Sequence, residues 1–293
     1  MAFDYLEQIK RLSIIAIFSD DDFMEKFVLK GGNVLDLVYR VSVRSSIDID
    51  LSMEEEFDVD TLDMIKAKFQ RILESTFHEK GYAVFDVEFQ EKPKEIHPEL
   101  KDFWGGYEIR FKVIRLAEYK KFSSDIASLR RNALVVGPKN VRTYSIEISK
   151  FEYCEEKTYR VLDGYRIYLY TPEMIVIEKL RAICQQMPEY KEIVHGTYQT
   201  ARARDFVDIY HLTVEYRIKI DSKDNIELLK NIFGAKRVPL RLLGEINKFR
   251  EFHREDFRAV VDTVRAGAKL KEYDFYFDYV VRICDGLKSL WKV

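Results

Sequence analysis

The sequence has few cysteines, no long apolar run and almost no net charge. Its three cysteines, Cys154, Cys184 and Cys284, are far apart and odd in number, which argues against a disulfide framework and favours a reducing compartment. No apolar stretch approaches the ~20 residues that span a bilayer, and residues 1–5 lack the features of a signal peptide. These absences predict a cytoplasmic protein with no membrane partner.

Clustered metal-binding histidines and nucleophile motifs are missing as well. The five histidines show no His-x-x-x-His or His/Cys spacing, so zinc chemistry has little support. A net charge of −2 excludes a generally basic nucleic-acid coat, but residues 109–146 contain only two acids. This stretch predicts a phosphate-facing surface, although a solvated mixed surface would have the same composition. Its nine basic residues are Arg110, Lys112, Arg115, Lys120, Lys121, Arg130, Arg131, Lys139 and Arg142.

The order of predicted elements favours two domains. Apolar spacing predicts helix over the first ~27 residues, and helix and strand then alternate up to residue 170. Thr171-Pro172 is typical of a helix start, with threonine as the cap and proline at the first helical position. The sequence therefore predicts an α/β (α+β) domain with a mixed sheet flanked by helices at 1–170, followed by a mainly helical domain at 171–293.

A pair of aspartates lies on one predicted strand. Residues 46–52 alternate between apolar and polar, so Asp48 and Asp50 share a face. Residues two apart on a strand lie ~6–7 Å from each other, which lets two carboxylates bridge a pair of hard cations. Nucleotidyl transfer needs such metal ions, and Mg²⁺ is the natural occupant. Taken alone, the pair is a weak signal that often arises by chance, and a solvated strand face is then the favoured interpretation.

Two glycines lie between a strand and a helix upstream of the aspartates. Gly31 and Gly32 would let backbone N–H groups approach phosphate oxygens, and Asn33 adds a side-chain amide. A tight connection is the alternative interpretation. Together with the aspartates, these residues would form a phosphate-binding and a metal-binding half of one site.

Residues 29–35 (Leu-Lys-Gly-Gly-Asn-Val-Leu) and 44–51 (Arg-Ser-Ser-Ile-Asp-Ile-Asp-Leu) resemble motifs of the AbiEii/AbiGii nucleotidyltransferase toxins, a family of the DNA polymerase β superfamily. Thr171-Pro172-Glu173 and residues 178–182 are similar to its Glu-Lys-Leu-x-Ala helix, and 203–210 to its Arg-Asp-x-x-Asp helix. The motifs follow the family's order. Asn33 departs from the hydroxyl residue that is usual there, which puts phosphate binding at that position in question.

The resemblance implies a third acid on a neighbouring strand, completing a two-Mg²⁺ site and accepting the proton of the attacking hydroxyl. Glu147 is the favoured candidate, because it is polar on an alternating strand shortly before Thr171. Glu108 has a similar setting and stays open. Both could also be ordinary exposed strand residues. The predicted catalytic and metal-binding residues are thus Asp48, Asp50 and Glu147.

The resemblance also implies contacts to a nucleoside triphosphate. Lys179 could instead be a surface lysine lying over apolar neighbours. Arg204 and Asp208 could form an ordinary helix ion pair, Arg44 could pair with an acid, and Ser46 could orient Asp48. The predicted nucleotide-binding residues are Gly31, Gly32, Asn33, Arg44, Ser46, Lys179, Arg204, Asp205 and Asp208.

The leading functional hypothesis is a Mg²⁺-dependent enzyme that transfers a nucleoside monophosphate from a triphosphate to an acceptor hydroxyl. The resemblance implies RNA, particularly a tRNA 3′ end, as acceptor, and a toxin role in a toxin–antitoxin or phage-defence system with a cognate antitoxin. A non-catalytic nucleotide sensor or partner-binding module of the same fold is one alternative. A transferase that modifies a protein or small molecule is another.

Overall fold

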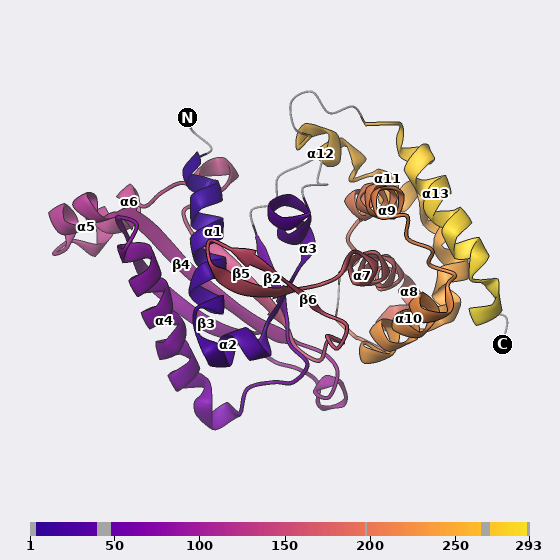
Figure 1. The fold of residues 1–293 in the computed structure, drawn as a ribbon, viewed down its shortest axis with the longest axis horizontal. Coiled ribbons are helices and arrows are strands. Elements are labelled where there is room, and N and C mark those ends of the chain that lie inside the picture. Colours follow the sequence, from indigo (N-terminus) through magenta and orange to yellow (C-terminus); the bar gives the residue numbers. More distant parts are fainter. Residues whose placement is uncertain (1–3, 40–47, 197, 265–269, 292–293) are drawn as a thin grey trace. The chain divides into compact units, whose positions relative to one another are not determined.

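The computed structural model describes residues 4–39, 48–196, 198–264 and 270–291. The chain forms two compact units (Figure 1). The first unit comprises Met1–Asn33 and Ser46–Leu169, and the second comprises Val34–Ser45 and Tyr170–Val293. No helix in these described ranges is both long and apolar enough to cross a membrane.

The second unit takes up a segment that the sequence interpretation placed in the first. The boundary after Leu169 lies next to the predicted one, but Val34–Ser45 groups with the helical unit. Tyr39 shows the reason, since its hydroxyl donates to the Tyr170 carbonyl oxygen at 2.8 Å and its ring meets that of Tyr216 edge-on. Long-range contacts of this kind leave no local signal in the sequence.

The first unit contains a seven-stranded mixed sheet in the order β3-β4-β5-β2-β1-β7-β6, which confirms the predicted fold class. β2 is parallel to β5 and β1 is parallel to β7, whereas the other neighbours are antiparallel. β6 was not predicted, although Asp163-Gly164, with φ of 50° and 92°, is typical of a two-residue hairpin turn. The strands are β1 Val28–Lys30, β2 Ile49–Ser52, β3 Tyr82–Lys92, β4 Gly106–Arg115, β5 Tyr144–Ser149, β6 Thr158–Leu162 and β7 Tyr165–Leu169.

Helices cover one face of this sheet (Figure 1). Phe69 and Phe77 of α4 pack on Phe89 and Phe111 of the sheet, with ring centroids 5.8 Å and 5.9 Å apart. Burial of such aromatic side chains supplies much of the core's stabilisation. The residues that alternate with Phe89 along β3 and with Phe111 along β4 therefore project from the opposite face of the sheet, away from α4. The helices are α1 Asp4–Phe18, α2 Asp21–Lys26, α3 Gly31–Asn33, α4 Leu62–His78, α5 Leu116–Phe122 and α6 Ile126–Asn132.

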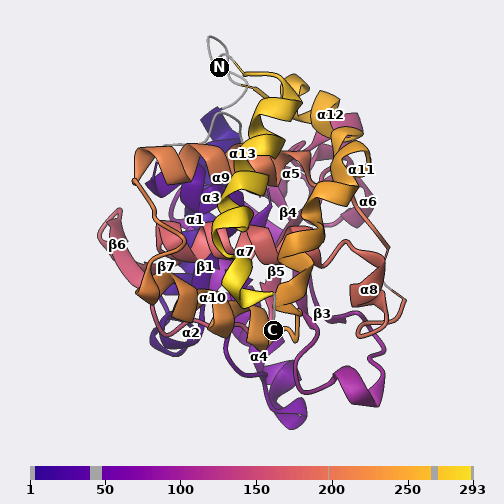
Figure 2. The same ribbon diagram turned by 90° about the vertical axis from the view of Figure 1, so that its right-hand side faces the viewer.

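The second unit is helical and is built around α7 (Figure 2). The side chains of α7 are buried nearly all round. The α7 helix begins as predicted: the Thr171 hydroxyl accepts from the Met174 N–H at 3.2 Å, and Pro172 takes the first helical position. Both α9 and α10 pack against α7. The helices are α7 Pro172–Cys184, α8 Pro188–Lys191, α9 Ala203–Glu215, α10 Lys223–Ala235, α11 Arg250–Arg254, α12 Phe257–Asp262 and α13 Tyr273–Gly286, with a 3-10 helix at Leu240–Phe249.

Candidate functional site

A row of polar residues crosses the sheet on the face opposite α4. In strand order the row reads Gln90, Glu108, Glu147, Asp50 and Lys30, each directly paired with the next. Directly paired residues project from the same face of a sheet, and neighbouring strands lie about 4.8 Å apart. Strands distant in sequence thereby bring three carboxylates into consecutive positions.

Asp48 and Asp50 begin this site as the alternating pattern predicted. Ile49 between them is completely buried, whereas Asp50 is half-buried and Asp48 is exposed. Burial, together with the negative charges of Asp48 and Asp50, raises the pKa of Tyr144 well above its usual value. The Tyr144 hydroxyl therefore stays protonated next to the aspartate pair.

Gly31 lies directly against one of the aspartates. The α3 helix starts at Gly31 immediately after β1, and φ of Gly31 is +71°, in the left-handed region that favours glycine. A Cβ at this position would lie 2.3 Å from Oδ2 of Asp50, far inside van der Waals contact. The glycine is required both for its backbone conformation and for the space that Asp50 occupies. Gly32 follows in the same turn and is half-buried.

Gly31→Ala is expected to lower the free energy of unfolding by about 2 kcal/mol, the sum of left-handed backbone strain and displacement of Asp50. Gly81→Ala is the matched control. Gly81 has a similar φ of +81°, but a Cβ there would meet nothing within 4 Å. Urea unfolding should show a smaller loss of about 1 kcal/mol for Gly81→Ala. Equal losses for both variants would show that contact with Asp50 does not constrain Gly31.

Asn33 has a different environment from the predicted one. Its side chain is completely buried, and Nδ2 donates to the backbone carbonyl oxygen of Asp48. Its Oδ1 is buried with no hydrogen-bond partner among the described residues. Asn33 thus braces the residue that precedes β2 rather than presenting its amide to a ligand. Arg44 and Ser46, the predicted nucleotide contacts in the same motif, lie outside the described residues.

The two candidate third carboxylates differ in their distance from the aspartates. Glu147 is directly opposite Asp50, whereas Glu108 lies one strand further away, at about twice the spacing. Lys92 Nζ lies 2.7 Å from Oε1 of Glu147 and 3.6 Å from Oε1 of Glu108, and Gln90 donates to the other Glu108 oxygen at 2.7 Å. Strand register therefore favours Glu147 as the partner of Asp50.

Lys92 was missed by the sequence interpretation. Burial lowers the pKa of Lys92, but its hydrogen bond to Glu147 and the charges of Glu147 and Glu108 outweigh this and raise the pKa above its usual value. Lys92 is therefore protonated at neutral pH. The alternation of β3 could have placed it on the polar face, but nothing local indicated which strands lie beside β3.

The carboxylate oxygens of this row are of the kind that a hard divalent cation prefers. Among the described residues, no group of three or more Asp, Glu, His or Cys side chains has an arrangement that could hold a metal ion. The Glu147 carboxylate is paired with Lys92, yet its backbone position lies directly next to Asp50. A rotation of the Glu147 side chain would bring its carboxylate beside that of Asp50. Together with Asp48, these residues offer carboxylate oxygens, the ligand type that Mg²⁺ prefers.

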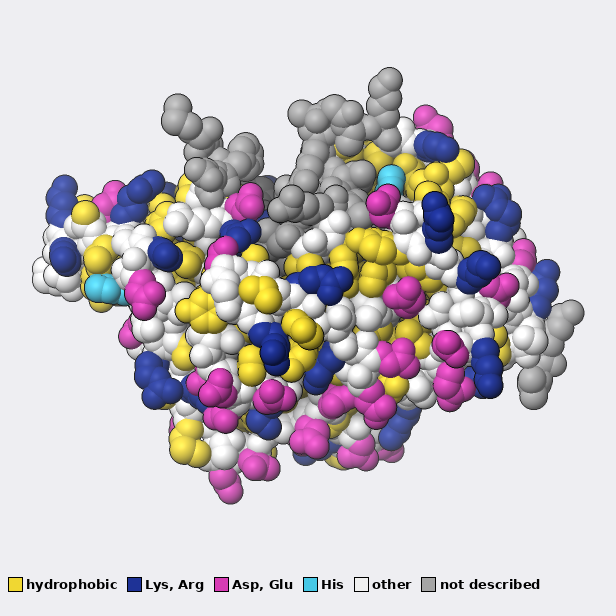
Figure 3. All heavy atoms as spheres, viewed as in Figure 1, with side chains coloured by type: hydrophobic (Ala, Val, Ile, Leu, Met, Phe, Trp, Pro, Cys, Tyr) yellow, Lys and Arg dark blue, Asp and Glu magenta, His cyan; other side chains and the backbone are white. Residues whose placement is uncertain are grey.

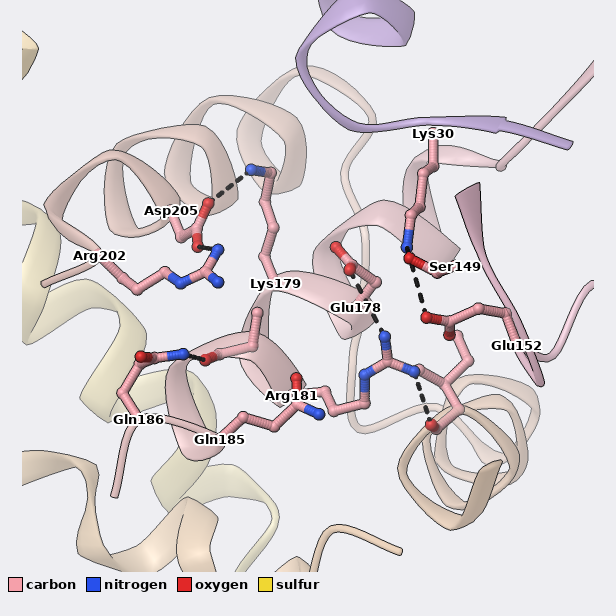
Figure 4. A network of polar contacts seen from close by, with 12 residues as sticks. Lys30, Ser149, Glu152, Glu178, Lys179, Arg181, Gln185, Gln186, Arg202 and Asp205 are labelled. Carbon is pink, nitrogen blue, oxygen red and sulfur yellow. Dashed lines mark hydrogen bonds and ion pairs between the residues drawn. The ribbon is translucent and has the colours of Figure 1, made fainter. Parts of the chain in front are cut away.

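Lys30, at the other end of the row, fixes strands to one another. It is nearly buried, and its Nζ donates to Ser149 Oγ at 3.1 Å and lies 3.4 Å from Glu152 Oε1 (Figure 4). Ser149 ends β5, two residues beyond Glu147 on the same face. Lys30 thus connects the strand before the glycines to the strand that carries the third acid.

Lys179 in the second unit is buried between two aspartates of α9. Its Nζ lies 2.7 Å from Asp205 Oδ1 (Figure 4). It also lies 2.9 Å from Asp208 Oδ2, and the side chains of Lys179, Asp205 and Asp208 are 7%, 4% and 3% exposed. Arg202 adds a contact of 3.4 Å to Asp205. The interpretation of Lys179 as a surface lysine was therefore wrong. Arg204 is half-exposed and lies 3.8 Å from Asp256 rather than forming the ion pair with Asp208 that the helix spacing allowed.

His253, on α11, lies beside this cluster and predicts a pH dependence. Its Nδ1 accepts from the Arg202 backbone N–H at 3.1 Å, and burial lowers its pKa to about 4 from 6.5. The unfolded chain therefore binds a proton that the folded chain does not between pH 6.5 and 4, so stability falls as the pH drops through this window. The loss is at most about 3 kcal/mol.

His253→Asn should remove this part of the pH dependence, because asparagine keeps an acceptor near the Nδ1 position without titrating. Urea unfolding of wild type and variant at pH 7, 6, 5 and 4.5 measures the difference. The stability gap between the two proteins should shift in favour of the variant at acid pH. A gap that is constant with pH would contradict the buried neutral histidine.

The mixed sheet with paired aspartates beside a glycine helix start defines a nucleotidyltransferase fold. The model of one family, the nucleotidyl transferase AbiEii toxin of a type IV toxin–antitoxin system, matches residues 13–279, and the chain belongs to this family. The resemblance found in the motifs is thereby confirmed. The chain matches none of the curated proteins.

The comparison with solved structures finds matches at low sequence identity. The crystal structure of JHP933 from Helicobacter pylori matches with a TM-score of 0.50 and 18% identity, over 98% of this chain and 93% of that one. A second Helicobacter pylori protein, provisionally described as a nucleotidyltransferase, matches with a TM-score of 0.49 and 16% identity, over 98% and 96% of the two chains. At 18% identity, the likeness to JHP933 concerns the fold.

Proposed function

We propose that this member of the nucleotidyl transferase toxin family is a Mg²⁺-dependent enzyme that transfers a nucleoside monophosphate from a triphosphate to an acceptor hydroxyl. The observation that carries the proposal is the direct pairing of Asp50 with Glu147 on one sheet face, with Gly31 packed against Asp50. Phosphoryl-type transfer depends on positioning and charge neutralisation more than on covalent chemistry. The carboxylates of Asp50 and Glu147, next to the helix that begins at Gly31, would provide the positioning and the metal ligands for such a reaction.

The residues divide the chemistry between them. Asp48, Asp50 and Glu147 would hold two Mg²⁺ ions, which supply charge neutralisation at the phosphoryl oxygens when bound. The acceptor oxygen would form a bond to the α-phosphorus while the bond to the β-phosphate breaks and pyrophosphate leaves. A carboxylate oxygen of Glu147 would accept the proton from the acceptor hydroxyl. Gly31 and Gly32 would leave room for the triphosphate beside the metal site.

The remaining nucleotide contacts stay predictions from the family resemblance. Asp205 and Asp208 are both held by Lys179, which supports a structural role for the three in joining α7 to α9. Arg204 has a half-exposed side chain and is the more accessible member of its motif. We propose that Arg204 contributes to nucleotide binding, with the buried cluster keeping α9 in position.

The acceptor that we propose is RNA, with a tRNA 3′ end as the leading candidate. Within the basic stretch, Arg130 forms two hydrogen bonds to Asp86, Lys112 lies 3.7 Å from the same acid, and Arg131 lies 4.0 Å from Asp125. The others are available to phosphates, which dominate affinity for RNA. The basic residues with no acidic partner among the described residues are Arg110, Arg115, Lys120, Lys121, Lys139 and Arg142.

These cations lie on β4, on α5 and in the loop before β5. Figure 3 shows Lys and Arg side chains around the end of the first unit formed by α5 and α6.

We also propose a cognate antitoxin and a cytoplasmic site of action. The family, which is described as a type IV toxin of a toxin–antitoxin system, supports the antitoxin. The few and widely separated cysteines support the cytoplasmic site.

The test is incubation with Mg²⁺, each labelled nucleoside triphosphate, and total RNA, cell protein or no acceptor. The expected result is label on RNA together with an equal amount of pyrophosphate. Label on protein instead of RNA would show that the acceptor is a protein. Binding of a triphosphate in calorimetry without any pyrophosphate release would favour the nucleotide sensor.

A further inference from the structure

We propose that Lys92 is an internal cation that holds Glu147 away from the aspartates until a divalent metal ion displaces it. This inference rests on the proposed role of Glu147 as the third metal ligand. It adds a residue of β3, two strands away, that sets how readily the metal site is completed.

Lys92 reaches Glu147 by crossing a strand at a glycine. In the sheet register Lys92 pairs with Gly106 of β4, and Gly106 pairs with Ser149 of β5. Because Gly106 has no side chain, the Lys92 side chain can lie across β4 and reach Glu147, two residues before Ser149. A Cβ at Gly106 would lie 2.1 Å from the Ile148 carbonyl oxygen, so this position stays without a side chain.

The direction of approach makes Lys92 a competitor of the metal. The strand order β3-β4-β5-β2 places Lys92 on one side of Glu147 and Asp50 on the other. Nζ of Lys92 at 2.7 Å draws the Glu147 carboxylate towards β4. Glu108, which Lys92 approaches at 3.6 Å, is held separately by Gln90. Glu147 is therefore the acid that Lys92 contacts most closely, and Lys92 and Asp50 lie on opposite sides of it.

Electrostatics explains why a lysine is present and why a metal can replace it. Carboxylates in consecutive register positions repel one another, and the ammonium group offsets this repulsion in the absence of metal. Mg²⁺ carries twice the charge and binds carboxylate oxygens at about 2.0–2.1 Å. The side chains of Lys92 and Glu147 are 51% and 46% exposed, so their ion pair is weak. Lys92 thus tunes metal binding without blocking it.

Lys92→Met tests this directly, because methionine keeps the unbranched stem and removes the charge. Mn²⁺ binding, followed by the electron paramagnetic resonance signal of the free ion without nucleotide, should be about two- to five-fold tighter in the variant. Lys94→Met is the matched control, since Lys94 is an exposed lysine two residues further on with no acidic partner in the described part of the chain. It should bind Mn²⁺ as the wild type does.

A double-mutant cycle separates a local effect from a general loss of positive charge. In a Glu147→Gln background, Lys92→Met should change Mn²⁺ affinity by less than about 1.5-fold, because Lys92 acts through Glu147. The same gain in both backgrounds, or unchanged or weaker binding in Lys92→Met alone, would overturn the proposal. If Asp50→Asn also bound Mn²⁺ like the wild type, the metal site and the proposed function would fail together, whereas Asp50-dependent binding that ignores Lys92 would refute this inference alone.

Discussion

Asp50→Asn is expected to lower the rate of nucleotidyl transfer by about 10³-fold or more while leaving the fold intact. Loss of a carboxylate from the proposed metal site would remove several kcal/mol of charge stabilisation in the transition state, and each ~1.4 kcal/mol is about a factor of ten in rate. Asp50 is half-buried and asparagine has nearly the same shape, so its packing against Gly31 is preserved. The measurement is pyrophosphate release at saturating Mg²⁺, with circular dichroism to confirm folding.

The matched control for this experiment is Asp60→Asn. Asp60 follows shortly after β2 in the sequence, is exposed, and has no basic partner in the described residues. The same chemical change there should leave the rate within about two-fold of wild type, as expected for a surface substitution. A folded Asp50→Asn variant with wild-type activity would exclude the metal-site assignment, whatever the result at Asp60.

Lys179→Met is expected to destabilise the protein by about 3–5 kcal/mol. Removal of one member of a buried ion cluster leaves the other charges only partly compensated in a medium that solvates them poorly. Here the two carboxylates of Asp205 and Asp208 would lose their shared cation while only 4% and 3% exposed. Urea unfolding followed by tryptophan fluorescence measures the loss. Neutralising all three residues in one variant should recover part of it.

Lys230→Met is the control for the stability measurement. Lys230 lies on α10, is half-exposed, and forms an i,i+3 ion pair of 3.4 Å with Glu227. Such a surface pair contributes at most about 0.5 kcal/mol. Losses of similar size at Lys179 and Lys230 would show that the buried cluster is not structural. Normal stability of Lys179→Met with lost triphosphate binding would support the nucleotide contact that the family resemblance implies.

Local elements could be predicted well from the sequence because local patterns specify them. Thr171-Pro172 marked the start of α7 through capping geometry, which depends only on nearby residues. The alternation of residues 46–52 placed Asp48 and Asp50 on one face, and the order of motifs identified the family that the family model then matched. β6 and α5 were missed, although the Asp163-Gly164 turn carried a hairpin signal.

Which residues surround the aspartates depended on strand pairing. Glu147 and Glu108 looked alike in sequence, and the register of β2 with β5 distinguishes them, since it places Glu147 directly beside Asp50. Lys92 enters the site only because β3 and β4 lie beside β5 in the sheet. Pairings such as that of Asp50 with Glu147 join residues far apart in the sequence and arise when the whole sheet assembles, so no short window of sequence encodes them.

The sequence by itself determined the paired aspartates, the glycine helix start and the family, because strand periodicity and steric requirements are local properties. Only the tertiary structure decided which residues contact one another. Asp50 packs against Gly31, and Lys92 forms an ion pair with Glu147. Asn33 donates a hydrogen bond to the Asp48 carbonyl oxygen, and Lys179 is held between Asp205 and Asp208. The physical reason is that a charged side chain takes the partner that folding brings nearest. The degree of burial then determines whether that side chain stabilises the fold or remains accessible to a ligand.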